Sequence, residues 1–359
     1  MKKILSLTLA IIMLLALFGC ANDTPVGDDV SDAPQTESSE SSEPVDLAQG
    51  KTVACCMGSI YHPVHRVVQY GFCTKSEELG MNPIISGLDE GSQQELIDKW
   101  NSDIASNNAV GALIWTGDDS CYEMMKELKQ QGVYTVVPHF IHDYERTQSF
   151  IDKDIAFRES DYGKAAADFI VERLIEAGIT EGSIGITLQG TGIGTGVIAY
   201  DAFSARIKEL GGGYSVLPPA MEGNETTYAT NIITNYIKGN PDMVAGFGTT
   251  GYSPVTWAAA MENADRGDII AVGVSWDDAN ITLIENGTIA GTVCLPVHEE
   301  AAASVTALYD MVNGKVFNTN ENTWLEIVEA PVASLNGEGK NNIQTYRDIY
   351  DAAQAYFEE

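Results

Sequence analysis

Three histidines and several aromatic residues stand where apolar, strand-like runs of the sequence end. They are His62, His65 and His139, accompanied by Trp115, Phe140 and Trp276. Aromatic faces with neutral hydrogen-bonding edges suit a ligand with a flat ring, such as a nucleobase, another heterocycle or an aromatic compound, and the apolar face of a sugar can also stack on them. Protonated histidines would instead attract a carboxylate or a phosphate. These residue types predict a site that binds a small molecule by stacking and hydrogen bonding.

The sequence lacks the patterns that bond-making chemistry or a metal requires. It contains no G-x-S-x-G, no evident Ser-His-Asp order and no recognisable pair of catalytic carboxylates. It also contains no C-x-x-C or H-E-x-x-H, so a zinc site has no support from spacing, and a three-histidine site is a weak alternative. Asp277 and Asp278 are adjacent, which favours capping of the next helix or a hydrogen bond to ligand over acid–base work. We expect a protein that is not an enzyme and has no metal or cofactor.

The cysteines do not form a recognisable framework. Besides Cys20 there are Cys55, Cys56, Cys73, Cys121 and Cys294, an odd number without regular spacing. Cys55 and Cys56 lie inside an apolar run, which favours small buried hydrophobic residues over ligands or nucleophiles.

A glycine-rich segment, residues 190–196, separates a strand-like run from a helix-like segment. It fits neither the dinucleotide motif G-x-G-x-x-G nor a P-loop. Two interpretations stay open: a flexible loop that brings backbone close to ligand, or a helix N-terminus that binds an anionic group.

Apolar strand-like runs alternate with helix-period segments from residue 52 onward. Such alternation predicts parallel sheets that helices cover on both faces. The pattern restarts after Phe157, so we expect an α/β protein with two doubly wound domains. Ligands of such sheets bind beyond the carboxyl ends of the strands, which here are residues 59–65, 115–117, 137–140, 190–197, 249–252 and 274–277. Beyond Val316 we expect one more crossing between the domains and a helix on the second domain.

The first twenty residues have the composition of a secretory signal. Lys2 and Lys3 precede a short apolar run at residues 4–18, which is too short for a spanning helix. The end of this run, Leu-Phe-Gly-Cys, resembles a bacterial lipobox, which implies cleavage after residue 19 and lipidation of Cys20. The alternative is an ordinary cleaved signal followed by an incidental cysteine. We expect a lipid-anchored protein on the outer face of the cell membrane.

The segment after Cys20 is acidic, and so is the rest of the chain. Residues 21–49 hold eight acidic residues and no Lys or Arg, a composition that predicts a disordered, extended linker. The whole chain carries a formal net charge of −31; without the two leader lysines and the eight linker acids, −25 remains. This balance disfavours nucleic acid, which proteins bind through Lys and Arg.

The order of motifs in residues 51–315 is similar to the sugar-type periplasmic binding proteins, the ribose-binding-protein-like group of type 1 folds. The segment TVACCMGSIYHPVHRVVQYGFCTKSEELG resembles the opening strand, ligand loop and first helix of that family. It is followed at the family's spacings by AVGALIWTGDD, GVYTVVPHF, ESDYGKAAADFI, NPDMVAGFGTT, AVGVSWDD and ENGTIAGTVCLP. DNA-binding repressors share this core, but they begin with a helix-turn-helix where this chain has a signal and linker.

The resemblance implies two lobes, a three-stranded hinge and a ligand in the cleft between the lobes. The first lobe would comprise residues 50–157 and about 296–330, and the second residues 158–295 and about 331–359. It implies a binding protein that hands a small molecule to an ABC permease, and we expect this protein to be a monomer. A ligand-sensing module for chemotaxis or signalling is the alternative that the sequence leaves open.

We carry the family's ligand-binding positions over to this sequence one by one, and most of them fall on uncharged residues. In the first lobe and hinge they are His62, Val64, His65, Trp115, His139, Phe140 and Phe157; in the second they are Val197, Thr250, Ser275 and Leu295, next to Trp276. Nearly every charged group that would grip sugar hydroxyls is replaced, and burying hydroxyls without partners costs a few kcal/mol each by order of magnitude. The family resemblance therefore predicts a sugar ligand, whereas the residues at these positions predict an aromatic or heterocyclic ligand. The alternative for the tryptophans and phenylalanines is a place in the domain cores, and Val197 and Leu295 could simply pack.

Overall fold

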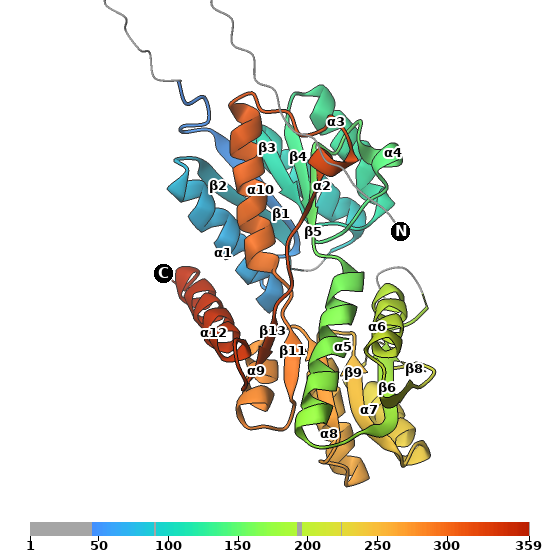
Figure 1. Ribbon diagram of the computed structural model, residues 1–359. Coiled ribbons are helices and arrows are strands. Elements are labelled where there is room, and N and C mark those ends of the chain that lie inside the picture. Colours follow the sequence, from blue (N-terminus) through green and yellow to red (C-terminus); the bar gives the residue numbers. More distant parts are fainter. Residues whose placement is uncertain (1–44, 90, 192–195, 224, 359) are drawn as a thin grey trace, which may run out of the picture. The chain divides into compact units, whose positions relative to one another are not determined.

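Two parallel sheets organise the described part of the chain (Figure 1). The computed structural model describes residues 45–358 apart from 90, 192–195 and 224. The predicted leader, Cys20, most of the acidic linker and the centre of the glycine-rich loop lie outside the described residues. Within residues 45–358, no helix has both the length and the apolar character needed to cross a membrane.

Each sheet has the same order of strands, which confirms the predicted doubly wound α/β fold. The first-lobe sheet runs β2-β1-β3-β4-β5-β12 and the second-lobe sheet β7-β6-β9-β10-β11-β13. All pairs are parallel except β13, which is antiparallel to β11. The first-lobe strands are β1 (Thr52–Ser59), β2 (Asn82–Leu88), β3 (Gly111–Ile114), β4 (Tyr134–Pro138), β5 (Lys153–Ala156) and β12 (Leu325–Ile327). The second-lobe strands are β6 (Glu181–Leu188), β7 (Gly213–Val216), β8 (Ala220–Met221, paired with β6), β9 (Met243–Gly248), β10 (Ile270–Val274), β11 (Gly291–Val293) and β13 (Val332–Ser334).

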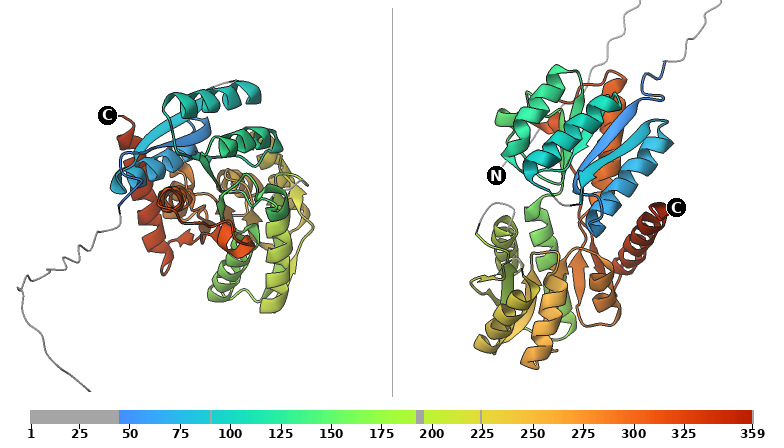
Figure 2. Two further views of the ribbon diagram at one scale, coloured as in Figure 1. Left: turned by 90° about the horizontal axis from the view of Figure 1, so that it is seen from above. Right: turned by 180° about the vertical axis from the view of Figure 1, so that it is seen from behind.

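Helices cover both faces of each sheet (Figures 1 and 2). In the first lobe they are α1 (Pro63–Glu78), α2 (Gln93–Ser106), the 3-10 turn η1 (Asp119–Cys121), α3 (Tyr122–Gln130), α4 (Tyr144–Thr147), α10 (Val297–Val312) and α11 (Glu321–Trp324). In the second they are α5 (Glu159–Glu176), α6 (Val197–Leu210), α7 (Thr226–Gly239), α8 (Ser253–Ala264), α9 (Asp278–Glu285) and α12 (Gly339–Tyr356).

The buried strand β1 shows why the apolar run folds this way. Cys55 belongs to the core on the α1–α10 face, and its neighbours Ala54 and Cys56 belong to the core on the α2–α3 face. Alternate side chains of a strand point to opposite faces, so a strand that is covered on both faces must be apolar at every position. The prediction that Cys55 and Cys56 are small buried residues is confirmed, since both are fully buried free thiols.

The chain passes between the two sheets three times. The passages join β5 to α5, β11 to α10, and β12 to β13. The last passage and the helix α12 that follows it, which packs on β13 and α9, are the expected elements beyond Val316. The two lobes belong to one compact unit of the chain.

Candidate functional site

The predicted histidines and aromatic residues of the first lobe form one aromatic cluster. The Trp115 ring stacks on His139 with centroids 4.6 Å apart and planes 20° apart. Phe140 meets Trp115 edge-on at 6.0 Å. On the other side, His65 meets Trp115 edge-on at 5.8 Å, and His62 lies 4.8 Å from His65. The cluster therefore joins residues that follow three different strands.

The hinge residue Phe157 extends this cluster toward the second lobe. Its ring centroid lies 5.0 Å from that of His139 and 5.7 Å from that of Tyr162, which belongs to α5. Phe157 is nearly buried, with 9% of its surface exposed. It is both a member of the aromatic cluster and part of the second-lobe core. A place in the core therefore does not exclude contact with a ligand at this position.

Parallel strands bring these residues together because their carboxyl ends share one sheet edge. Two of the residues at these edges have a left-handed backbone that non-glycine residues rarely adopt: His139 with φ +77° and Ser275 with φ +81°. They occupy matching places, directly after β4 and just after β10. The His139 N–H donates to Ile155 O at 2.8 Å and the Ser275 N–H to Val293 O at 2.9 Å. Such strained positions cost about 1–3 kcal/mol each and gather at functional sites, which makes both edges candidates.

The histidines at the start of α1 have different roles. His62 is exposed and caps α1, because its Nδ1 accepts a hydrogen bond from the Val64 N–H at 3.3 Å. His65 Nδ1 lies 2.7 Å from the Ser59 carbonyl oxygen, to which the Nδ1–H tautomer donates. Burial lowers the pKa of His65 to about 4. His65 is therefore neutral at pH 7 and offers a ring edge, not a positive charge, to a ligand.

Beneath the cluster lies Glu300, a residue that the sequence prediction missed. This carboxyl group is fully buried, and its Oε2 is 3.0 Å from His139 Nδ1. Its Oε1 accepts a hydrogen bond from the Phe157 N–H at 3.1 Å. Burial raises the pKa of Glu300, and the nearby His139 opposes that rise. A signal existed in the sequence: Glu300 begins the buried i, i+4, i+8 stripe of α10 that continues with Ser304 and Leu308.

The predicted residues of the second lobe are less closely gathered. Trp276 is nearly buried, and its indole N–H donates to Leu295 O at 2.7 Å. Val197, the first residue of α6, packs against the second-lobe core, as does Leu295. Asp277 caps α9 by accepting from the Asn280 N–H at 2.9 Å, so the capping prediction is confirmed. Val197 and Leu295 are thus partly buried at the edge of the core, and their contact with a ligand stays a prediction.

Thr250 leads to a second buried carboxyl group that the sequence prediction missed. The Thr250 and Ser253 hydroxyls donate to Glu222 Oε1 at 2.7 and 2.9 Å. Glu222 is fully buried, its Oε2 has no hydrogen-bond partner among the described residues, and burial raises its pKa. The Glu222 N–H donates to Leu188 O at the end of β6, which places it at the carboxyl edge of the sheet. Its only sequence signal was an acidic residue after a short apolar strand.

One small pocket is lined by predicted residues of both lobes. Val64 comes from α1 of the first lobe, and Ser275, Trp276 and Asp277 come from the second. Tyr350 of α12, which the prediction did not include, completes its wall. This arrangement offers aromatic faces, a hydroxyl and a few polar edges, which are features of binding and not of bond making.

A family model for the periplasmic binding protein domain matches residues 53–316. The chain belongs to the periplasmic binding protein family. Members of this family bind their ligands without catalysis, in agreement with the expectation that the chain is not an enzyme.

Solved structures share the fold at low sequence identity. AraP, an arabinose-binding protein from Geobacillus stearothermophilus, is similar with a TM-score of 0.71 and 14% identity, over 83% of this chain and 99% of AraP. A sugar-binding protein of a sugar ABC transporter from Bacillus halodurans is similar with a TM-score of 0.70 and 14% identity, over 83% of this chain and 99% of that protein. A solute-binding protein from Actinobacillus succinogenes with bound D-allose is similar with a TM-score of 0.68 and 14% identity, over 81% of this chain and 99% of that protein. No curated protein sequence matches the chain.

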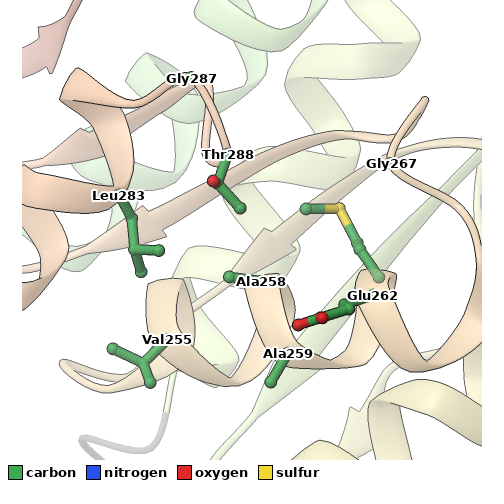
Figure 3. Close-up of a pocket in the computed structure, with 9 residues that line it drawn as sticks. Val255, Ala258, Ala259, Glu262, Gly267, Leu283, Gly287 and Thr288 are labelled. Atoms are coloured by element: carbon green, nitrogen blue, oxygen red, sulfur yellow. The ribbon is translucent and has the colours of Figure 1, made fainter.

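A larger hollow of this periplasmic binding protein lies elsewhere, between α8 and α9 (Figure 3). It measures about 550 Å³, and its wall is formed by Val255, Ala258, Ala259, Met261, Glu262, Gly267, Leu283, Gly287 and Thr288. Gly267 and Thr288 precede β10 and β11, so the hollow opens at the amino ends of the strands. Ligands of doubly wound sheets bind at the opposite edge, and we therefore place the site at the aromatic cluster.

At the end of the glycine-rich loop, the structure explains why residue 196 is a glycine. Gly196, directly before α6, has φ +92°, and a Cβ there would collide with the Thr249 side chain. Its glycine is thus explained by backbone conformation and close packing. Whether residues 192–195 contact a ligand or an anion lies outside the described residues.

Within the described ranges, no group of three or more His, Cys, Asp or Glu side chains is arranged to hold a metal ion. His62 and His65 lie near one another, but His139 Nδ1 faces Glu300. The three-histidine alternative therefore gains no geometric support.

Proposed function

We propose that this protein captures a small sugar-like molecule outside the cytoplasm and delivers it to an ABC import permease. The observation that carries the proposal is the aromatic cluster around Trp115 at the ligand-binding edge of a periplasmic binding protein fold. Similar solved structures are described as binding arabinose and D-allose. A sugar ring can lay its apolar face on Trp115 or His139, and buried polar edges can meet its hydroxyls.

The ligand class has a finer alternative. Because neutral His65, Trp115 and Phe140 replace groups that would grip hydroxyls, an aromatic or heterocyclic ring fits the same wall. Both classes share the requirement for a stacking face. The experiment below separates them.

A thermal-unfolding screen tests the proposal. The purified protein is heated with D-allose, arabinose, glucose or galactose, and in parallel with adenosine or benzoate. A binder at a hundred times its dissociation constant adds about 2.7 kcal/mol to the free energy of unfolding. Stabilisation by a sugar supports the sugar assignment, stabilisation by adenosine or benzoate alone replaces it with the ring-compound assignment, and no response to any compound counts against the binding function.

A Trp115→Ala variant locates the site. We expect its dissociation constant for the stabilising compound to rise about tenfold, which corresponds to about 1.4 kcal/mol. Ile175→Ala, at an exposed position on α5, is the control and should bind as the unchanged protein does. Equal affinity of the Trp115→Ala variant would remove Trp115 from the site.

We further propose that lipid on Cys20 holds the protein at the outer face of the membrane, with the acidic residues 21–49 as a spacer. A Cys20→Ser variant is expected to leave the membrane fraction when cells are fractionated. Retention of that variant in the membrane fraction would contradict lipid anchoring.

A further inference from the structure

The C-terminal helix α12 lies beyond residues 53–316, the part that matches the family model. It is fixed to the second lobe by charged and polar contacts. Arg347 Nη1 and Nη2 donate to Asp278 Oδ1 and Glu285 Oε2 of α9 at 2.9 and 2.8 Å. Asn342 Nδ2 donates to Val332 O of β13 at 2.7 Å. Figure 1 shows α12 in red alongside α9.

The far end of α12 contacts the first lobe. The Tyr356 hydroxyl donates to Glu77 Oε1 of α1 at 2.7 Å, and its ring meets Tyr70 edge-on at 5.6 Å. Phe357, just after the helix, lies 5.7 Å from the Arg66 guanidinium. The helix α12 therefore contacts both lobes.

The middle of α12 packs on the predicted ligand residue Trp276. The Tyr346 ring lies 5.0 Å from the Trp276 ring, and the Tyr350 ring meets Trp276 edge-on at 6.4 Å. Tyr346 is buried, whereas Tyr350 is half-buried and lines the pocket that Val64 and Ser275 also line. Tyr346 thus supports the Trp276 ring, and Tyr350 lines the small pocket beside it, which measures about 10 Å³.

The Tyr350 hydroxyl is available for a ligand. It makes no hydrogen bond with any described residue, in contrast to the Tyr356 hydroxyl on the same helix. Burial, together with Asp278 and Asp277, raises the pKa of Tyr350, so its phenol stays protonated and can donate at neutral pH.

We propose that α12 forms a third wall of the ligand site and that Tyr350 contacts the ligand, a ring compound that carries hydroxyl groups. The inference rests on the proposed sugar-binding function. A tyrosine suits this place because its ring offers an apolar edge and its hydroxyl both donates and accepts a hydrogen bond. Tyr350 adds a phenol to a pocket wall whose other polar residues are Ser275 and Asp277.

The test compares three single variants of the full chain: Tyr350→Phe, Tyr350→Ala and Tyr356→Phe. Calorimetric titrations use arabinose, D-allose, glucose and galactose with each variant. Tyr350→Phe removes only the hydroxyl, and the loss of one hydrogen bond should weaken binding about fivefold. Tyr350→Ala also removes the ring and should weaken binding about tenfold or more. Tyr356→Phe removes a hydroxyl from the same helix, away from the pocket, and should bind within about twofold of the unchanged protein.

The outcomes distinguish this inference from the proposed function. Failure of all four sugars to bind the unchanged protein overturns both. Binding to the unchanged protein with both Tyr350 variants within about twofold overturns the third wall alone. Equal weakening by Tyr356→Phe also overturns it, because the effect would then come from the position of α12. Circular dichroism checks folding, and Tyr350→Phe, which keeps the ring, decides the question if Tyr350→Ala does not fold.

Discussion

Glu222 and Glu300 are both fully buried carboxyl groups, yet their surroundings differ. Glu300 shares its two oxygens between His139 and the Phe157 N–H. Glu222 has two hydroxyl donors on one oxygen and no partner for the other among the described residues. A buried carboxyl group that lacks a full set of hydrogen-bond partners favours its protonated, uncharged form. At the residue scale, burial and the unpartnered oxygen both favour the protonated form of Glu222.

A Glu222→Gln variant tests this cost through pH. Because the folded-state pKa of Glu222 is raised above 4.5, its favourable contribution to stability is present below about pH 4.5 and is lost as the pH rises through the folded-state value. The variant keeps an oxygen acceptor for Thr250 and Ser253 but carries no charge. We expect the unchanged protein to lose stability relative to the variant as the pH rises above about 4.5, measured by urea unfolding at each pH. Parallel pH profiles for the two proteins would show that Glu222 does not titrate in this range.

The helix pair α5–α6 shows how a single residue limits the distance between elements. A Cβ on Gly163 of α5 would collide with the carbonyl oxygen of Ala199 on α6 and lie 3.0 Å from its Cα. These are backbone atoms, so the neighbour cannot rotate away. The helical pattern of α5 is visible in the sequence, but the need for glycine inside it depends on where α6 lies.

Gly163→Ala brings two effects into opposition. Alanine favours a helix over glycine by about 1 kcal/mol, whereas overpacking against fixed backbone costs about 1–3 kcal/mol. We expect a net loss of about 1 kcal/mol or more in the free energy of unfolding, measured with urea. Gly239→Ala is the matched control: it lies at the end of α7 with nothing within 4 Å of the added Cβ, and it should be neutral or stabilising. A stabilised Gly163→Ala protein would show that α5 and α6 can separate easily.

At the scale of the whole molecule, Glu300 joins two of the three passages between the lobes. It lies near the start of α10, which follows the second passage, and it holds the Phe157 N–H in the first. Its bond to His139 connects the same point to the aromatic cluster. The aromatic cluster and the connection between the lobes therefore share one buried side chain.

Replacement of Glu300 should affect the whole molecule in a way that depends on the substitute. Glu300→Ala leaves the Phe157 N–H and His139 Nδ1 without partners, and unsatisfied buried groups cost about 1–3 kcal/mol each. We expect a loss of about 3 kcal/mol in urea unfolding. Glu300→Gln should stay within about 1 kcal/mol, because its amide can accept from Phe157 and donate to His139. An alanine variant as stable as the glutamine variant would refute this role.

The sequence by itself determined the local and repetitive features: apolar strands, intervening helices, two doubly wound sheets, and the strand ends where His65, Trp115 and His139 gather. These features follow from patterns of a few residues, and parallel strands necessarily share an edge for their carboxyl ends. Only the tertiary structure decided the partners of the buried acids and the place of α12. Glu300 finds His139 across 161 residues, and Glu222 finds Thr250 across 28. Such pairs depend on the path of the chain between them, which no local pattern of residues specifies.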